Sequence, residues 1–177
     1  MTNSVKFEVI PGYAPKKAIT QKIRDFLKKF NPLELNTSTI PLLLMDPKSQ
    51  SYYLICHLDS ETLSAKTDID AVLDPQESED YKLNRDIYTD TYAYRVMESD
   101  AMNGRAFEDI VVEYATSYRP SRPLKVFGGQ HRITAINEAS KHGVSAFHGI
   151  RVYFDFSIEQ RLEIATAKKT KGSGLNI

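Results

Sequence analysis

The sequence contains few of the residues from which cross-links and metal centres are built. Its 177 residues include one cysteine, Cys56, and four histidines. A single cysteine excludes an intramolecular disulfide, and without any CxxC or HxxxH spacing a structural zinc site is not expected. The longest apolar run, residues 41–45, is far too short to cross a bilayer. Because residues 1–6 also lack the apolar run of a signal peptide, we expect a cytoplasmic protein without membrane contact.

An excess of charge of either sign is also missing. Lys and Arg together number 23, as do Asp and Glu, so the formal net charge is zero. Domains that hold nucleic acid through their overall charge usually have a basic excess. The composition therefore gives no support to that mode of binding, although it allows a local basic patch. Hydrophobic residues make up 41% of the chain and charged residues 26%, which is typical of a globular protein.

The hydrophobic patterns predict one α+β domain over residues 1–177. Residues 1–66 are expected to form a scaffold, residues 80–170 the second part of the domain, and residues 171–177 a tail or linker. Turn-forming residues 46–51 predict a hairpin, and the acidic segment 67–79 is expected to be a loop or hinge. Ser157 and Gln160 predict a capping box at the start of the last expected helix. The expected strands cover residues 5–10, 40–45, 52–58, 124–127 and 149–156, and the expected helices cover residues 18–30, 89–102, 107–118, 130–141 and 158–168.

The sequence Gly128-Gly129-Gln130-His131-Arg132 lies between an expected strand and an expected helix. The two glycines allow a sharp turn and a close approach of the backbone to a ligand. The start of the helix offers backbone N–H groups and the positive end of its dipole to an anion. His131 and Arg132 add side-chain donors, and arginine can bind two phosphate oxygens at once. Gln130 either contacts the ligand or replaces an N-cap residue, and the alternative for His131 and Arg132 is simple helix capping.

The run from Phe127 to Ala135, FGGQHRITA, resembles the signature of the ParB/sulfiredoxin superfamily. Its DGQHR branch, linked to DNA modification and phage defence, has the same four residues as Gly129 to Arg132. The resemblance implies that Gly128, Gly129, His131 and Arg132 bind the phosphates of a nucleotide. It also implies a ParB/sulfiredoxin-like fold, with a small mixed sheet and packed helices.

Three further basic residues are candidates for the same site. Arg85, in the segment LNRDI, matches an upstream Asn-x-Arg-like element of the family more loosely. Arg85 either completes the phosphate site from the opposite wall or forms a surface salt bridge. Lys125 and Arg122 flank the motif, and we expect both side chains to be solvated.

The function that the resemblance implies is nucleotide or phosphate binding in a DNA-associated, ParB-like system. ATP or CTP with Mg²⁺ is the expected ligand, hydrolysis or transfer of a nucleotide phosphate is the expected chemistry if the protein is an enzyme, and DNA and a second copy in a homodimer are the expected partners. Sulfiredoxins need a cysteine where this chain has Gln130. Because glutamine has no thiolate to attack a phosphorylated sulfinate, sulfinic acid reduction is not expected.

Three other functions stay open at this stage. The turn can hold a backbone phosphate in a non-catalytic DNA-binding or assembly module. A ParB-like nuclease would need metal-binding carboxylates near Arg132, and the candidates are Asp109 and Glu113. Those two acids lie four residues apart on the expected helix 107–118, where they can share a Mg²⁺ or form a solvated face. A free-amino-acid kinase would need a carboxylate base near the phosphates, which the sequence does not place.

Overall fold

A mixed β-sheet is the centre of the part of the chain that the structure, a computed structural model, describes. That part comprises residues 5–10, 12, 14–69, 89–117, 119–154, 156–157 and 159–164. The strands are β1 (Glu8–Val9), β2 (Leu42–Asp46), β3 (Ser51–Asp59), β4 (Thr67–Asp68), β5 (Ile110–Tyr114), β6 (Leu124–Gly128) and β7 (Phe147–Phe154). The helices are α1 (Lys17–Phe30), α2 (Leu33–Asn36), α3 (Ser60–Lys66), α4 (Tyr92–Met102) and α5 (Gln130–Lys141), and residues 159–164 form a further helical segment.

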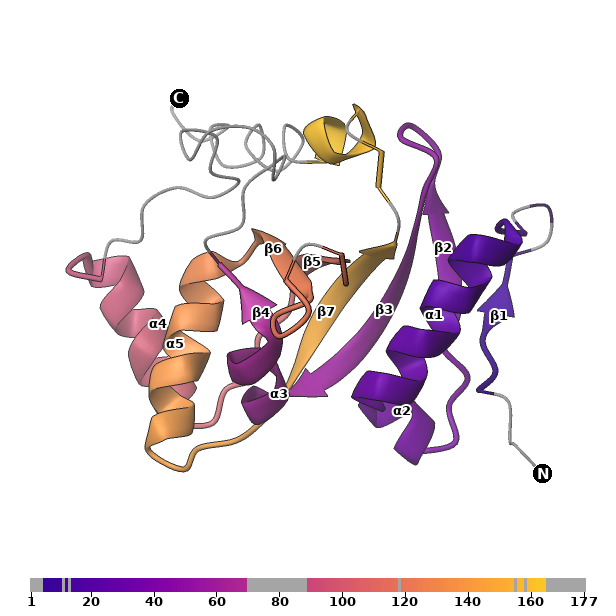
Figure 1. Ribbon diagram of the computed structural model, residues 1–177. Helices are drawn as coiled ribbons and strands as arrows, with labels where there is room; N and C mark the ends of the chain where they lie inside the picture. The colour runs from indigo at the N-terminus through magenta and orange to yellow at the C-terminus, as the bar shows by residue number, and fades with distance from the viewer. Residues whose placement is uncertain are drawn as a thin grey trace.

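The seven strands follow the order β1-β2-β3-β7-β5-β6-β4 (Figure 1). The expectation of one α+β domain is therefore confirmed. β1 with β2, β5 with β7 and β4 with β6 are parallel pairs, and the remaining neighbours are antiparallel. Figure 1 shows α4 and α5 together at one end of the sheet and α1 and α2 at the other. None of the described helices is long and apolar enough to cross a membrane.

The first half of the chain follows its sequence pattern closely. α1 buries its periodic residues Ile23, Phe26, Leu27 and Phe30, and it ends at Asn31 in the left-handed conformation. The predicted hairpin is confirmed by the antiparallel pairing of β2 with β3. The expected strand over residues 5–10 is reduced to the two residues of β1.

The larger hydrophobic core lies between one face of the sheet and the helices. The sheet contributes alternate residues of its central strands, such as Leu54, Val112 and Val152, all fully buried. The helices contribute the buried residues of α1, Leu63 of α3 and the apolar face of α5. The position of α5, which carries the motif, is thus fixed by packing against α4, α3 and β5.

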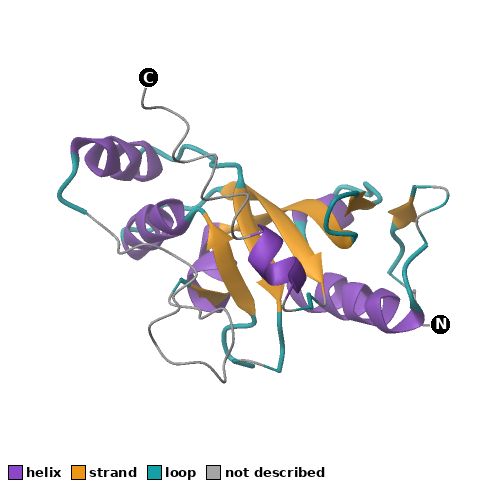
Figure 2. Ribbon diagram, turned by 90° about the horizontal axis from the view of Figure 1, so that it is seen from above, coloured by secondary structure: helices purple, strands orange, loops and turns teal. Residues whose placement is uncertain are grey.

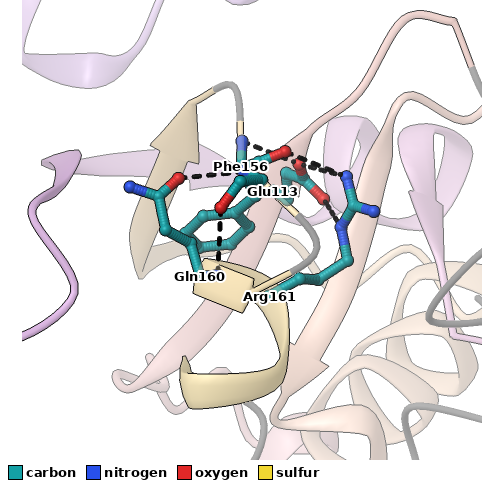
Figure 3. Close-up of polar contacts among 5 residues, drawn as sticks. Glu113, Phe156, Gln160 and Arg161 are labelled. Atoms are coloured by element: carbon teal, nitrogen blue, oxygen red, sulfur yellow. Dashed lines mark hydrogen bonds and ion pairs between the residues drawn. The ribbon is translucent and has the colours of Figure 1, made fainter.

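The C-terminal helical segment covers part of the opposite face, where Val111, Phe127, Tyr153, Phe156 and Ile164 form a smaller buried cluster. The predicted capping box at its start is confirmed. The Ser157 backbone N–H donates to Gln160 Oε1 at 2.9 Å, and the Gln160 N–H donates to Ser157 Oγ at 3.2 Å. Figure 3 shows how Arg161 then reaches the sheet at Glu113.

The helix predicted over residues 107–118 is wrong, because residues 110–114 form the strand β5. Phe107, Ile110, Val111 and Tyr114 have helical spacing, yet every residue of β5 is buried. A strand with both faces covered shows a continuous apolar run instead of an alternating one. The two periodicities cannot be separated over so short a run.

A row of charged side chains crosses this second face, and it corrects the expectation that Lys125 is solvated. Lys125 is 1% exposed and lies beside Asp68 of β4 and Glu113 of β5 in the strand register. Arg119 adds an ion pair to Asp68 at 3.1 Å. Buried charges require such partners of opposite sign. Asp68 also belongs to the segment expected to be a loop, of which residues 67–68 instead form the edge strand β4. Arg122 is exposed as expected, and its Nη1 donates to Ser64 O and Thr67 O at 2.9 Å.

Candidate phosphate-binding site

The predicted strand–turn–helix unit is present, with β6 ending at Gly128 and α5 starting at Gln130. Gly129 occupies the N-cap position with φ +92°, in the left-handed region. A Cβ atom on Gly129 would lie 3.3 Å from Ile110 Cα and 3.3 Å from Ile110 Cγ1. Both the backbone conformation and the contact with β5 therefore favour glycine at this position.

The first turn of α5 is held rigidly. The Ile133 N–H donates to Gly129 O at 2.9 Å, closing the first helical hydrogen bond. Thr134 Oγ1 donates to Gln130 O at 2.9 Å. Gln130 itself is buried, as are Ile133, Ala135 and Ile136. The N-terminal N–H groups of a helix have no acceptor within the helix, so this fixed end presents donors in a defined direction.

His131 and Arg132 lie half-buried at the same turn. The His131 ring is 6.4 Å from the Tyr94 ring of α4, measured between centroids. Arg132 lines a cleft of about 440 Å³ between α4 and the loop of residues 105–109. Among the residues that the structure describes, Arg132 has neither a hydrogen bond nor an ion pair. Its guanidinium group thus keeps its donors for a ligand.

The cleft combines an apolar wall with a charged end. Ala93, Val96 and Met97 of α4 form the wall, and Phe107 contributes from the loop. At the charged end Asp100 and Arg105 form an ion pair at 3.5 Å. The charges left are the carboxylates of Glu108 and Asp109 and the guanidinium of Arg132, which sum to one negative charge. The two carboxylates would therefore repel a bare phosphate, and only the guanidinium group would attract it. A phosphate with a bound divalent cation suits the cleft better, because the cation is attracted by the carboxylates and the phosphate by the guanidinium group.

The predicted metal pair of Asp109 and Glu113 is not brought together as expected. Asp109 precedes β5 with φ +60° and lines the cleft. Glu113 is 2% exposed on the second face of the sheet. Arg161 Nε and Nη2 donate to its two carboxylate oxygens at 2.9 and 3.1 Å, and the Phe156 N–H donates to Oε2 at 3.3 Å. The carboxylate of Glu113 is thus fully engaged in structural contacts. The alternative prediction, that Glu113 belongs to a solvated helix face, is also wrong.

Glu108 takes the place that the sequence had suggested for Glu113, because it lines the cleft next to Asp109. The part of the chain that is described contains no group of three or more His, Cys, Asp or Glu suited to a metal ion. Magnesium in proteins is usually held by one or two carboxylates together with water and substrate phosphates. The donor set of the cleft fits Mg²⁺ that arrives with a phosphate ligand, and it does not fit a metal held by protein groups alone.

Residues beyond the motif support the cleft. The loop that carries Glu108 and Asp109 is attached to β7, where the Gly149 N–H donates to Phe107 O at 2.8 Å. The Phe107 N–H donates to Nδ1 of His148 at 2.9 Å. Sequence reasoning did not find this support, because 41 residues separate the two partners. Arg85, the other predicted site residue, lies outside the described residues.

No protein-family model matches the chain, and no curated protein or solved structure is significantly similar to it.

Proposed function

We propose that the cleft binds a nucleoside triphosphate together with Mg²⁺. The observation that carries this proposal is Arg132, a half-buried arginine without a described partner, at the N-terminus of a fixed helix and in a cleft that Glu108 and Asp109 also line. A guanidinium group binds two phosphate oxygens at once, and the helix end adds N–H donors and a positive dipole. Phosphate is the anion that these donors suit best.

The two carboxylates give the proposal its cation dependence. Glu108 and Asp109 outnumber the one unpaired cation of the cleft, so the triphosphate requires Mg²⁺ to neutralise them. The apolar wall of Ala93, Val96 and Met97 offers a surface of the kind on which a base or sugar packs. A nucleotide would contact both the apolar wall, through its base or sugar, and the charged residues, through its phosphates. Inorganic phosphate would contact the charged residues alone.

The proposal includes a ParB/sulfiredoxin-like fold and a cytoplasmic, DNA-associated role. Its support is the FGGQHR run and the position of that run between β6 and α5. ATP and CTP are the ligands to compare first. If the nucleotide is turned over, the groups around Arg132 stabilise charge on the phosphoryl group.

Sulfinic acid reduction has no support from the side chains. Gln130 stands at the position of the sulfiredoxin cysteine and is buried. Cys56 is fully buried on β3, and burial raises the pKa of its thiol strongly. A thiol with a raised pKa is a poor nucleophile, because the thiolate is the reactive form.

Calorimetric titration tests the proposal with ATP, CTP and GTP, each with and without Mg²⁺. Wild-type protein is expected to bind one of them saturably, with Mg²⁺ present. Arg132→Ala should weaken that binding roughly a hundredfold, because it removes a charge-assisted, bidentate contact. Arg95→Ala is the matched control, since Arg95 lies on α4 but does not line the cleft and instead bonds Asp90 O at 2.9 Å.

Several results of the same titrations would contradict the proposal. The proposal fails if no nucleotide binds, or if Arg132→Ala and Arg95→Ala bind it equally well. Binding of duplex DNA without nucleotide, weakening steeply with salt, would instead favour the non-catalytic DNA-binding module. The nuclease alternative needs a cluster of metal ligands, and the described residues contain none.

A further inference from the structure

A buried histidine lies directly behind the acidic loop of the cleft. His148 of β7 is 2% exposed, and its ring stacks on the Phe107 ring with centroids 5.8 Å apart. Its Nδ1 accepts the Phe107 N–H at 2.9 Å. Its Nε2 lies 3.0 Å from Oγ of Ser60, the first residue of α3 and itself 3% exposed. The ring thus connects the cleft loop to the first residue of α3.

The surrounding bonds allow one protonation state of His148. A backbone N–H can only donate, so Nδ1 must be without a proton and Nε2 must carry it. Ser60 Oγ accepts the Ala146 N–H at 3.0 Å and donates to Ala146 O at 3.2 Å. Oγ therefore receives the Nε2 proton of His148 while its own proton goes to Ala146. The neutral Nε2–H tautomer satisfies every donor and acceptor in this chain of bonds.

Burial keeps the ring neutral. It lowers the pKa of His148 to about 4, against a smaller opposing effect of Asp59. Neutral His148 is therefore an acceptor for Phe107 across the usual range of pH, and the acceptor is oriented by Ser60. Phe107 is followed directly by Glu108 and Asp109, and both residues line the cleft.

We propose that His148, oriented by Ser60, is a positioning residue for the Mg²⁺–nucleotide site, because it fixes Phe107 and so holds Glu108 and Asp109 at the cleft that Arg132 also lines. This inference rests on the proposed function. It assigns to His148 no contact with the ligand. Its effect is to hold the loop of residues 105–109 in place at the edge of the cleft.

Two substitutions separate the hydrogen bond from the ring stack. His148→Phe keeps a ring against Phe107 but has no acceptor. His148→Asn loses the ring, yet its amide oxygen lies close to the place of Nδ1 and can accept the Phe107 N–H. Amide hydrogen exchange of residues 105–109 is measured without ligand, and Mg²⁺–nucleotide affinity is measured by calorimetry on the same samples.

In His148→Phe the Phe107 amide should exchange at least about tenfold faster and Mg²⁺–nucleotide affinity should fall about tenfold, the effect of one lost buried hydrogen bond. His148→Asn should restore both to near wild type. Unchanged affinity in a His148→Phe variant whose loop exchanges faster would overturn the inference and leave the proposed function standing. Equal losses in both variants would overturn it too, because the ring stack and not the acceptor would then hold the loop.

Ser60→Ala keeps the test decisive if His148→Phe does not fold. This change leaves the ring in place but removes the acceptor of its Nε2–H, so Ser60 no longer orients the ring toward Phe107. Faster exchange of Phe107 is the expected result, and unchanged exchange would refute the orienting role of Ser60. If wild type binds no nucleotide, the proposed function and this inference about its site fail together, while the exchange data still show whether His148 holds the loop.

Discussion

Replacing Gly129 by alanine should destabilise the protein through two separate effects. The left-handed backbone at φ +92° disfavours any residue with a Cβ by about 1–2 kcal/mol. The new Cβ would also lie 3.3 Å from the Cα and Cγ1 atoms of Ile110, closer than the ~3.5–4.0 Å at which two carbon atoms attract. Ile110 belongs to a central strand and cannot move freely, so overpacking adds about 1–2 kcal/mol. The sum is about 2–4 kcal/mol.

Gly104 provides the matched control, because it has φ +81° and no atom within 4 Å of an added Cβ. Gly104→Ala should cost only the backbone part, about 1–2 kcal/mol. Urea unfolding followed by circular dichroism measures both variants against wild type. An equal loss in the two variants would refute the argument that the motif turn is packed against β5. Nucleotide affinity of folded Gly129→Ala should also fall, whereas that of Gly104→Ala should not.

Three further predictions concern buried polar groups. Arg161→Met leaves the carboxylate of Glu113 buried without its guanidinium partner and should lower the free energy of unfolding by about 3 kcal/mol; a urea midpoint equal to that of wild type would contradict this. Because the pKa of His148 falls from 6.5 to about 4 on folding, the unfolded state binds the proton first. The free energy of unfolding should therefore be unaffected above pH 6.5 and decrease toward pH 4, by up to about 3 kcal/mol, and His148→Phe should lack this component in thermal melts. The thiol of Cys56, buried and with a raised pKa, should react with a thiol reagent at pH 8 only after urea is added, and rapid labelling of native protein would show that β3 opens.

The sequence alone predicted those elements whose signals are local. The helix over residues 130–141 was predicted with its observed bounds, because Gly129 opens it and the apolar residues of its core face recur at helical spacing. The capping box of Ser157 and Gln160 and the hairpin of β2 and β3 likewise depend on neighbours in the chain. The motif turn was found for the same reason.

The features that the sequence did not predict depend on residues that are distant in the sequence and meet only in the folded protein. Glu113 is buried because Arg161, 48 residues later, neutralises it. Lys125 is buried because the register of three strands places it between Asp68 and Glu113. No local pattern distinguishes these residues from solvated ones. The cleft next to Arg132 was missed for a similar reason, since helix α4 and the loop of residues 105–109 meet α5 only through the tertiary fold.

The order of strands has a consequence for how the protein is made. β7 pairs with β3 on one side and with β5 on the other, so among the described strands it alone joins the N-terminal hairpin to the strands of the motif (Figure 1). Figure 2, seen from above, shows the strands at the centre of the molecule with helices around them. β7 comprises residues 147–154 and is therefore synthesised after the other six described strands. On the ribosome the hairpin and the Gly128–Arg132 turn can form early, but they stay unconnected until this last strand emerges. Contacts so distant in sequence slow folding, and we expect the native sheet to assemble late and in one cooperative step, with β7 inserting between two halves already made.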